Sequence, residues 1–208
     1  MPLHPRDEKA LPYRSLLFFG PPGAGKGTLC RFLSLAGGHV HLSSGDIFRG
    51  LSSDSPAGKV FHSYAGKGLL VPDEVTIGVW HHYVQELITA NRYLPEKQLL
   101  LLDGIPRTLK QAGMLDSYVE IIQVVVLEMA NVDHLFQRMQ KRAQIEKRTD
   151  DWDENVLRKR MQVYEKETLG LLSHYPKERI ARFNADQRPL EVLRDILDRF
   201  ASLLSFNG

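Results

Sequence analysis

A glycine-rich segment near the N-terminus constrains the fold more than any other feature of the sequence. Residues 20–28 read Gly-Pro-Pro-Gly-Ala-Gly-Lys-Gly-Thr, between an apolar run over residues 14–19 and a helical pattern over residues 28–36. Glycines let backbone N–H groups turn inward toward phosphate oxygens, and the N-terminus of a following helix adds its positive dipole end. A plain strand-to-helix turn with a surface lysine is the alternative. The strand, the spacing and the helix together favour a phosphate-binding loop.

Composition narrows the class of protein. The chain has 208 residues, of which 43% are hydrophobic and 25% charged, as expected for one globular domain. A formal net charge of +2 argues against a dedicated nucleic-acid binder. Cys30 is the one cysteine, so neither an intramolecular disulfide nor a cysteine zinc cluster can form. No apolar run approaches the ~20 residues of a membrane span, and residues 1–13, a Pro-rich charged arm, lack a signal core. We therefore expect a cytoplasmic protein without a membrane partner.

Apolar strand patterns alternate with helical patterns along the chain, which predicts an α/β fold with a parallel sheet covered on both faces. The strand candidates cover residues 14–19, 39–42, 98–102, 121–127 and 179–183, and the helix candidates cover residues 28–36, 73–90, 131–142, 153–172 and 189–204. Ligands on such sheets bind beyond the carboxyl ends of the strands. Residues 44–72 and 142–151 fit the alternation poorly, so we interpret them as insertions over that edge.

The end of the glycine-rich segment carries a family resemblance. Gly27, rather than Ser or Thr, follows Lys26, and the hydroxyl comes one place later at Thr28. This Gly-Lys-Gly-Thr ending is similar to that of the adenylate kinases, and four further segments match that family in order, as far as about Pro189. The resemblance implies a single P-loop NTPase-type domain over residues 1–208, with three layers and a five-stranded parallel sheet. It also implies an insertion for the nucleoside monophosphate (NMP) at residues 44–72 and a short lid at residues 138–151.

Two segments resemble the acceptor side of that family. Residues 42–49, Leu-Ser-Ser-Gly-Asp-Ile-Phe-Arg, match the segment in which a hydroxyl and an arginine hold the acceptor monophosphate, here Ser44 and Arg49. Without the family, the same residues read as a helix N-cap followed by a solvated charge. Residues 68–74 resemble the strip that packs on the acceptor base, to which Val71 would contribute. They also read as a helix start, and the two interpretations are compatible.

Residues 99–111 hold the most informative match. A run of leucines ends at Asp103, and an acid at the end of a buried strand can hold Mg²⁺ through water. Arg107 can clamp phosphate oxygens with its planar fork, and Gln111 offers the donor and the acceptor that suit an adenine edge. The family uses these positions in the same way, and Gln111 favours AMP over UMP or CMP. The alternative for this segment is purely structural: a strand ends there, and Thr108 caps the helix that follows.

Arginines cluster in the proposed lid. Arg138 and Arg142 lie four residues apart on one helical pattern, and Arg148 begins an Arg-Thr-Asp-Asp segment that resembles the family's lid signature. A solvated basic helix face is the alternative. The stretch from Asp151 to the next helical arginines is one residue longer than usual. The spacing to Tyr164 and Thr168 favours Arg160 over Arg158.

The resemblance implies a full set of site residues. Catalytic roles fall to Lys26, Arg107, Arg138, Arg148 and Arg160. ATP binding falls to Gly23, Ala24, Gly25, Lys26, Gly27, Thr28, Arg138, Arg142 and Arg188. AMP binding falls to Ser44, Arg49, Val71, Gly104, Arg107, Gln111, Arg148 and Arg160, and Mg²⁺ binding to Thr28 and Asp103.

The expected activity is reversible, Mg²⁺-dependent transfer from ATP to AMP, giving two ADP, by a monomer. A kinase for UMP, CMP or another monophosphate and a non-catalytic nucleotide-binding homologue remain open. A phosphate-loop kinase of a small metabolite or an ATPase is disfavoured by the acceptor segment together with Gln111.

Overall fold

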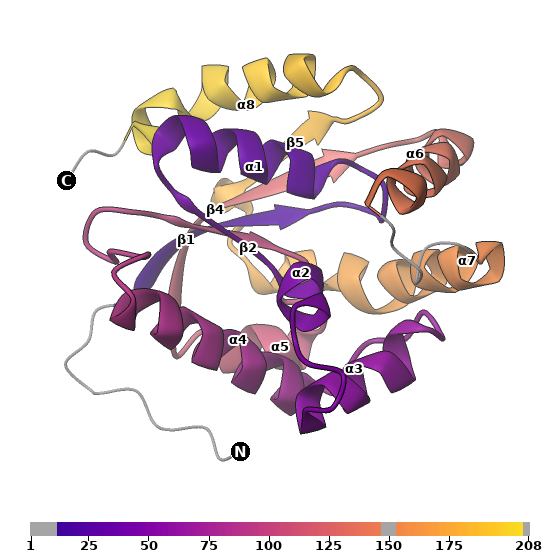
Figure 1. Cartoon of the computed structure of the whole chain (residues 1–208). Helices are drawn as coiled ribbons and strands as arrows, with labels where there is room; N and C mark the ends of the chain where they lie inside the picture. The colour runs from indigo at the N-terminus through magenta and orange to yellow at the C-terminus, as the bar shows by residue number, and fades with distance from the viewer. Residues whose placement is uncertain (1–11, 147–152, 206–208) are drawn as a thin grey trace.

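The computed structural model describes residues 12–146 and 153–205, and a parallel sheet of five strands lies at its centre (Figure 1). The strands are β1 (Tyr13–Phe19), β2 (Val40–Ser43), β3 (Leu100–Asp103), β4 (Val119–Glu128) and β5 (Ile180–Asn184), and their order in the sheet is β2-β3-β1-β4-β5. Every neighbouring pair is parallel. The predicted strands and the predicted parallel sheet are therefore confirmed.

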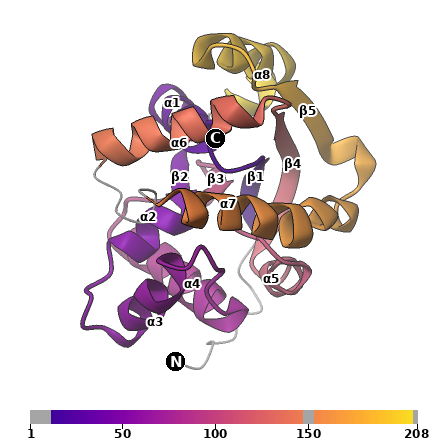
Figure 2. The same ribbon diagram turned by 90° about the vertical axis from the view of Figure 1, so that its right-hand side faces the viewer.

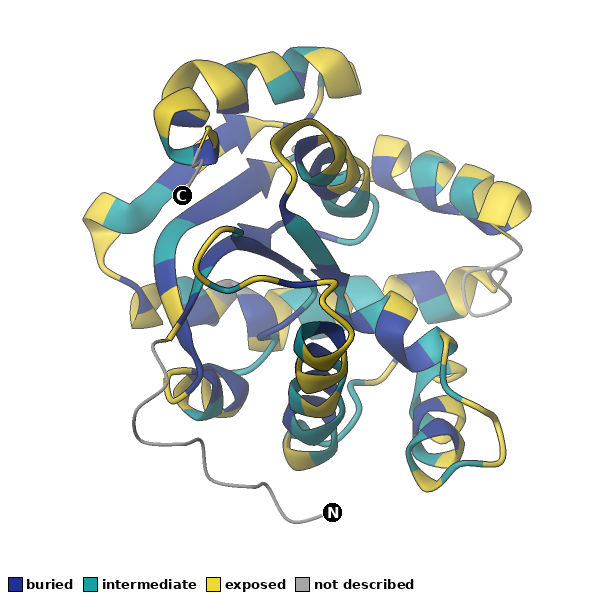
Figure 3. Ribbon diagram, turned by 60° about the vertical axis from the view of Figure 1, so that its left-hand side comes forward, coloured by how far each residue is buried: buried dark blue, intermediate teal, exposed yellow. Residues whose placement is uncertain are grey.

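Helices cover both faces of the sheet. Helices α1 (Lys26–Gly37) and α8 (Pro189–Leu204) lie on one face, and α4 (Asp73–Thr89) and α5 (Leu109–Leu115) lie on the other (Figure 1). The alternation of side chains along β1 divides the core in two. Leu16 and Phe18 pack with residues of α1 and α8, whereas Leu17 and Phe19 pack with residues of α4 and α5. The buried sheet between two half-exposed helical layers confirms the three-layer prediction (Figure 3).

The described parts of the segments interpreted as insertions lie at the carboxyl ends of the strands. Residues 44–72 contain α2 (Ser44–Arg49) and α3 (Pro56–Ala65), two helices that the sequence patterns did not predict separately. Helices α6 (Val132–Glu146) and α7 (Glu154–Val163) cross in front of the same edge of the sheet, and α2 and α3 lie below α7 in this view (Figure 2). Whether these segments act as NMP-binding and lid subdomains stays a prediction.

The predicted helix over residues 153–172 is partly wrong. The α-helix ends at Val163 and continues as a wider π-helical turn, η2 (Tyr164–Thr168), and a tighter 3₁₀ segment, η3 (Leu169–His174), with a short 3₁₀ turn η4 (Lys177–Arg179) before β5. Thr168 is buried there and donates a 3.1 Å hydrogen bond to the carbonyl oxygen of Arg107. This contact with the loop after β3 depends on tertiary packing, which apolar spacing does not record.

None of the helices in the described part of the chain has both the length and the apolarity that a bilayer crossing requires. The cytoplasmic location stays a prediction.

Candidate active site

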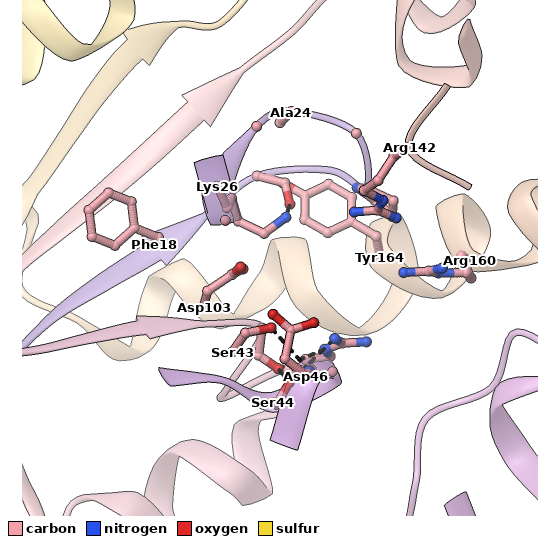
Figure 4. A pocket seen from close by; sticks show the side chains of 18 of the residues that line it. Phe18, Ala24, Lys26, Ser43, Ser44, Asp46, Asp103, Arg142, Arg160 and Tyr164 are labelled. Carbon is pink, nitrogen blue, oxygen red and sulfur yellow. Dashed lines mark hydrogen bonds between the residues drawn. The ribbon is translucent and has the colours of Figure 1, made fainter. Parts of the chain in front are cut away.

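One cavity of about 540 Å³ brings most of the predicted site residues together. It opens beyond the carboxyl ends of β1, β2 and β3, where Phe19, Ser43 and Asp103 reach its wall. This is the edge at which parallel α/β sheets bind ligands. The glycine-rich loop covers one side of the cavity, and α2 and the segment after β3 form the other (Figure 4).

The glycine-rich loop takes backbone conformations that favour glycine. Gly23 has a φ of +87° and Gly25 a φ of +97°, in the left-handed region that other residues rarely adopt. A Cβ atom on Gly23 would lie 2.8 Å from the carbonyl oxygen of Leu135 in α6. The loop therefore packs closely under α6, and α1 begins directly after it at Lys26. The N-terminus of α1 and loop residues 23–27 therefore line the cavity, which is the arrangement that anion binding uses.

Lys26 extends back across this loop. Its Nζ atom donates hydrogen bonds to the carbonyl oxygens of Gly20, at 2.7 Å, and Pro21, at 3.1 Å. Burial lowers the pKa of Lys26 to about 8, although the carboxylate of Asp103 acts in the opposite direction. The lysine is thus a half-buried cation beside the place where the loop would hold phosphate.

The candidate Mg²⁺ ligands have the chemistry that this ion prefers. Asp103 ends β3 and faces the cavity, and the hydroxyl of Thr28 lies at the cavity wall in the first turn of α1. Burial raises the pKa of Asp103, but the His41 ring 3.7 Å away and the Lys26 ammonium outweigh burial and hold it below the ordinary value. An ionised carboxylate and a hydroxyl fit a hard cation that keeps several of its waters. No cluster of three or more acidic, His or Cys ligands occurs among residues 12–146 and 153–205.

Arg107 ties the loop after β3 to the acceptor segment. Its Nε atom donates to the carbonyl oxygen of Gly104 at 2.7 Å, and its Nη2 atom lies 3.4 Å from the hydroxyl oxygen of Ser44. Ser44 donates to the same Gly104 carbonyl at 2.6 Å. Burial and the nearby Arg160 lower the pKa of Arg107 to about 10, so this guanidinium stays charged at neutral pH.

The remaining acceptor residues also reach the cavity. Arg49 pairs with Asp46 one helical turn away in α2, and both residues line the cavity. Asp46 lies below the glycine-rich loop (Figure 4). Val71 lines the wall, and its carbonyl oxygen accepts a 3.3 Å hydrogen bond from Thr76.

Gln111 is 2% exposed, yet it lines the cavity. Its Oε1 atom accepts from the backbone N–H of Arg107 at 2.8 Å, and its Nε2 atom donates to Asp73 at 2.9 Å. The sequence does not point to Asp73 as a site residue, because the helix dipole alone explains an acid in the first turn of α4.

The arginines of α6 and α7 do not all reach the cavity. Arg138, Arg142 and Arg160 line the cavity. Arg138 also donates to the carbonyl oxygens of Ala185, at 3.1 Å, and Gln187, at 3.2 Å, which fastens α6 to the loop after β5. Arg158 points elsewhere: it is exposed, pairs with Glu154 and lies 5.2 Å from the ring centroid of Phe136.

One predicted site residue lies away from the cavity, and another lies outside the described residues. Arg188 is exposed, is absent from the cavity wall, and precedes α8 with its backbone N–H donating to Glu191 at 2.8 Å. Its role in ATP binding stays a prediction that the geometry does not support. Arg148 lies outside the described residues, together with Asp150 and Asp151 of the proposed lid signature.

The fold and the loop define a nucleotide-binding protein of the phosphate-loop class. The family model for adenylate kinase matches residues 18–180. An adenylate kinase from Flavobacterium psychrophilum is 34% identical over 92% of this chain and 98% of its own length. Adenylate kinases from Corynebacterium urealyticum, at 36% identity over 82% of this chain and 90% of that protein, and Prochlorococcus marinus, at 39% over 77% and 82%, are similar as well. The chain belongs to the adenylate kinase family.

Proposed function

We propose that this protein transfers the terminal phosphoryl group of ATP reversibly to AMP, giving two ADP. The observation that carries the proposal is one cavity in which a phosphate-binding loop with its lysine faces the fixed arginine of an acceptor pocket. The glycine-rich loop is suited to the donor phosphates. The pocket of Ser44, Arg107 and Gln111 is suited to a monophosphate with a purine base. Membership of the adenylate kinase family supports both assignments.

The reaction needs no general base. A phosphate acceptor is already anionic at neutral pH, so its oxygen can attack without losing a proton to the protein. Catalysis then depends on holding donor and acceptor in line and on stabilising the charge that spreads over the moving group. On the donor side, this charge stabilisation comes from the ammonium of Lys26 and from backbone amides of the loop, apart from that of Ala24, which donates to the carbonyl oxygen of Pro21. The guanidinium of Arg107, held against Gly104 and Ser44, supplies it on the acceptor side.

Thr28 and Asp103 would hold Mg²⁺, with Asp103 acting through water. When bound, the ion neutralises charge on the oxygens of the donor phosphates. The low pKa of Asp103 keeps this carboxylate ionised and ready for a cation.

The arginines of α6 and α7 complete the charge cluster from the lid side. Arg138 and Arg148 would contact the transferring group, Arg142 the donor nucleotide and Arg160 the bound phosphates. Arg142 and Arg160 already face the cavity, close enough to Lys26 to affect its pKa. We expect a monomer, and light scattering of the purified protein tests that point.

A coupled assay of ADP formation tests the proposal. Purified protein is supplied with ATP, Mg²⁺ and each of AMP, UMP, CMP and GMP at equal concentration, and the series is repeated with GTP as donor. We expect AMP with ATP to give the highest kcat/KM, and two ADP for each ATP consumed. A higher value for UMP or CMP would make the protein a kinase of that monophosphate. Nucleotide binding without turnover would make it a non-catalytic homologue.

A further inference from the structure

We infer that Asp73 fixes the orientation of the Gln111 side-chain amide and thereby makes the acceptor pocket select 6-amino purines against 6-oxo purines. The inference rests on the proposed function, because it concerns the base of the acceptor. Asp73 is a positioning residue: it is half-buried at the start of α4 and is absent from the cavity wall, whereas Gln111 lines that wall from α5.

A closed ring of hydrogen bonds holds the amide. Gln111 Nε2 donates to Asp73 Oδ1 at 2.9 Å, and Thr108 Oγ1 donates to the same oxygen at 3.0 Å. The Thr108 hydroxyl oxygen in turn accepts from the backbone N–H of Gln111 at 3.1 Å. On the other side of the amide, Gln111 Oε1 accepts from the backbone N–H of Arg107 at 2.8 Å.

The partners themselves dictate which end of the amide is oxygen. A backbone N–H can only donate, so the atom that faces Arg107 must be the oxygen of Gln111. An ionised carboxylate can only accept, so the atom that faces Asp73 must be the nitrogen. Turning the amide by 180° would place two donors together at Arg107 and two acceptors together at Asp73. Buried groups left without partners in this way are costly, so the amide is held in one orientation.

The fixed amide leaves one donor and one acceptor for a ligand. Each primary amide has two N–H donors and two oxygen lone pairs, and the ring consumes one of each. Adenine presents a 6-amino donor beside the N1 acceptor, which matches the free lone pair of Oε1 beside the free proton of Nε2. Hypoxanthine presents the reverse order, the O6 acceptor beside the N1–H donor. It would require the turned amide that Asp73 opposes.

Binding of AMP and IMP to Asp73→Asn tests the inference. IMP differs from AMP only in the 6-oxo group and the N1 proton. Asparagine keeps the size of the side chain but can turn either a donor or an acceptor toward Gln111. The second constraint, the N–H of Arg107, remains, so we expect the ratio of the dissociation constants for IMP and AMP to fall about tenfold, or about 1.4 kcal/mol. Glu74→Gln is the matched control, because Glu74 is the neighbouring acid in the same turn of α4, is exposed and pairs with Lys110.

Calorimetric titration gives both constants without turnover, so the result is separable from the proposed activity. If the protein bound AMP but made no ADP, the proposed function would be wrong, and the dissociation constants would still test the role of Asp73. A lowered ratio in Asp73→Asn with an unchanged ratio in Glu74→Gln supports the inference. An unchanged ratio in Asp73→Asn, an equal fall in both variants, or a wild type that binds IMP as well as AMP overturns it. Thermal unfolding checks both variants, and Asp73→Ser is titrated in the same way if Asp73→Asn does not fold.

Discussion

The Nζ atom of Lys26 lies 2.7 Å from the carbonyl oxygen of Gly20, so the ammonium group is held against the first residue of the glycine-rich loop. Because the lysine sits beside the expected phosphate position, we expect Lys26→Met to lower kcat by about two orders of magnitude through lost charge stabilisation. Steady-state rates with saturating ATP and AMP measure this. Lys97→Met is the control, since Lys97 is exposed, lies outside the cavity wall and precedes β3 at the opposite edge of the sheet. A similar loss of kcat in both variants would contradict the catalytic role proposed for Lys26.

The pH dependence of ATP use follows from the same lysine. Burial brings the pKa of Lys26 to about 8, so its charged form dominates below that pH and is lost above it. We therefore expect kcat/KM for ATP to decline as the pH rises through about 8, measured between pH 7 and about 9.5. The pKa of Arg107 is about 10, so that arginine remains largely charged over this range. Lys26→Arg should move the decline to higher pH, and a decline at the same pH in this variant would assign it to another group.

Arg107→Ala tests the acceptor side. The side chain holds both Gly104 and Ser44 in place and offers its charge to phosphate, so its loss should affect binding and chemistry together. We expect kcat to fall about 100-fold and KM for AMP to rise, while KM for ATP changes less. Arg182→Ala, which removes an exposed arginine paired with Glu128, is the control. A change confined to KM for ATP would place Arg107 on the donor side instead.

Two arginines of α7 form a natural pair for comparison. Arg160 lines the cavity, whereas Arg158 is exposed and pairs with Glu154. Arg160→Ala should lower kcat at least tenfold, and Arg158→Ala should leave it within about twofold, since exposed ion pairs contribute little. The two variants are compared in the same coupled assay. Greater loss in Arg158→Ala would reverse the assignment made from the spacing to Tyr164 and Thr168.

His39 should make stability depend on pH. It is buried between α8 and the sheet, with Nε2 2.9 Å from the carbonyl oxygen of Leu204 and Nδ1 3.4 Å from the backbone N of Leu99. Burial lowers the pKa of His39 below its ordinary 6.5, so the unfolded chain binds a proton more readily than the folded one. This contribution is complete above about pH 6.5 and is lost as the pH falls through the folded pKa.

Urea unfolding at several pH values measures that loss. We expect the fall in unfolding free energy between about pH 7 and pH 5 to be smaller in His39→Gln than in the wild type. His82→Gln, a change at an exposed histidine, should keep the wild-type slope. Equal slopes in all three proteins would show that His39 does not contribute.

The parts of this molecule that could be predicted from its sequence are those that local pattern determines. The loop at residues 20–28 follows directly on an apolar strand and Asp103 ends another, so their place at the carboxyl edge of the sheet follows from the pattern alone. Asp73 could not be assigned in this way, because its partner Gln111 is 38 residues away and the contact exists only once α4 packs on α5. The wider turn at residues 164–168 depends likewise on packing, there of Thr168 on the loop of Arg107.

The predicted role of Arg188 in ATP binding stays a prediction. The segment that contains it resembles a donor-binding loop, but a resemblance of sequence does not say which way a side chain points. In this structure the residue lies at the exposed N-terminus of α8, where its backbone takes part in the helix cap.

A crystal structure with an analogue that joins two adenosines through a chain of phosphates tests the central claim most directly. We expect the phosphates to contact the backbone amides of residues 23–27, Lys26 and Arg107, and one adenine to contact Gln111. Arg138, Arg142 and Arg160 should reach the same phosphate chain from the lid side. An analogue bound elsewhere, or bound here with these cations turned toward solvent, would contradict the account.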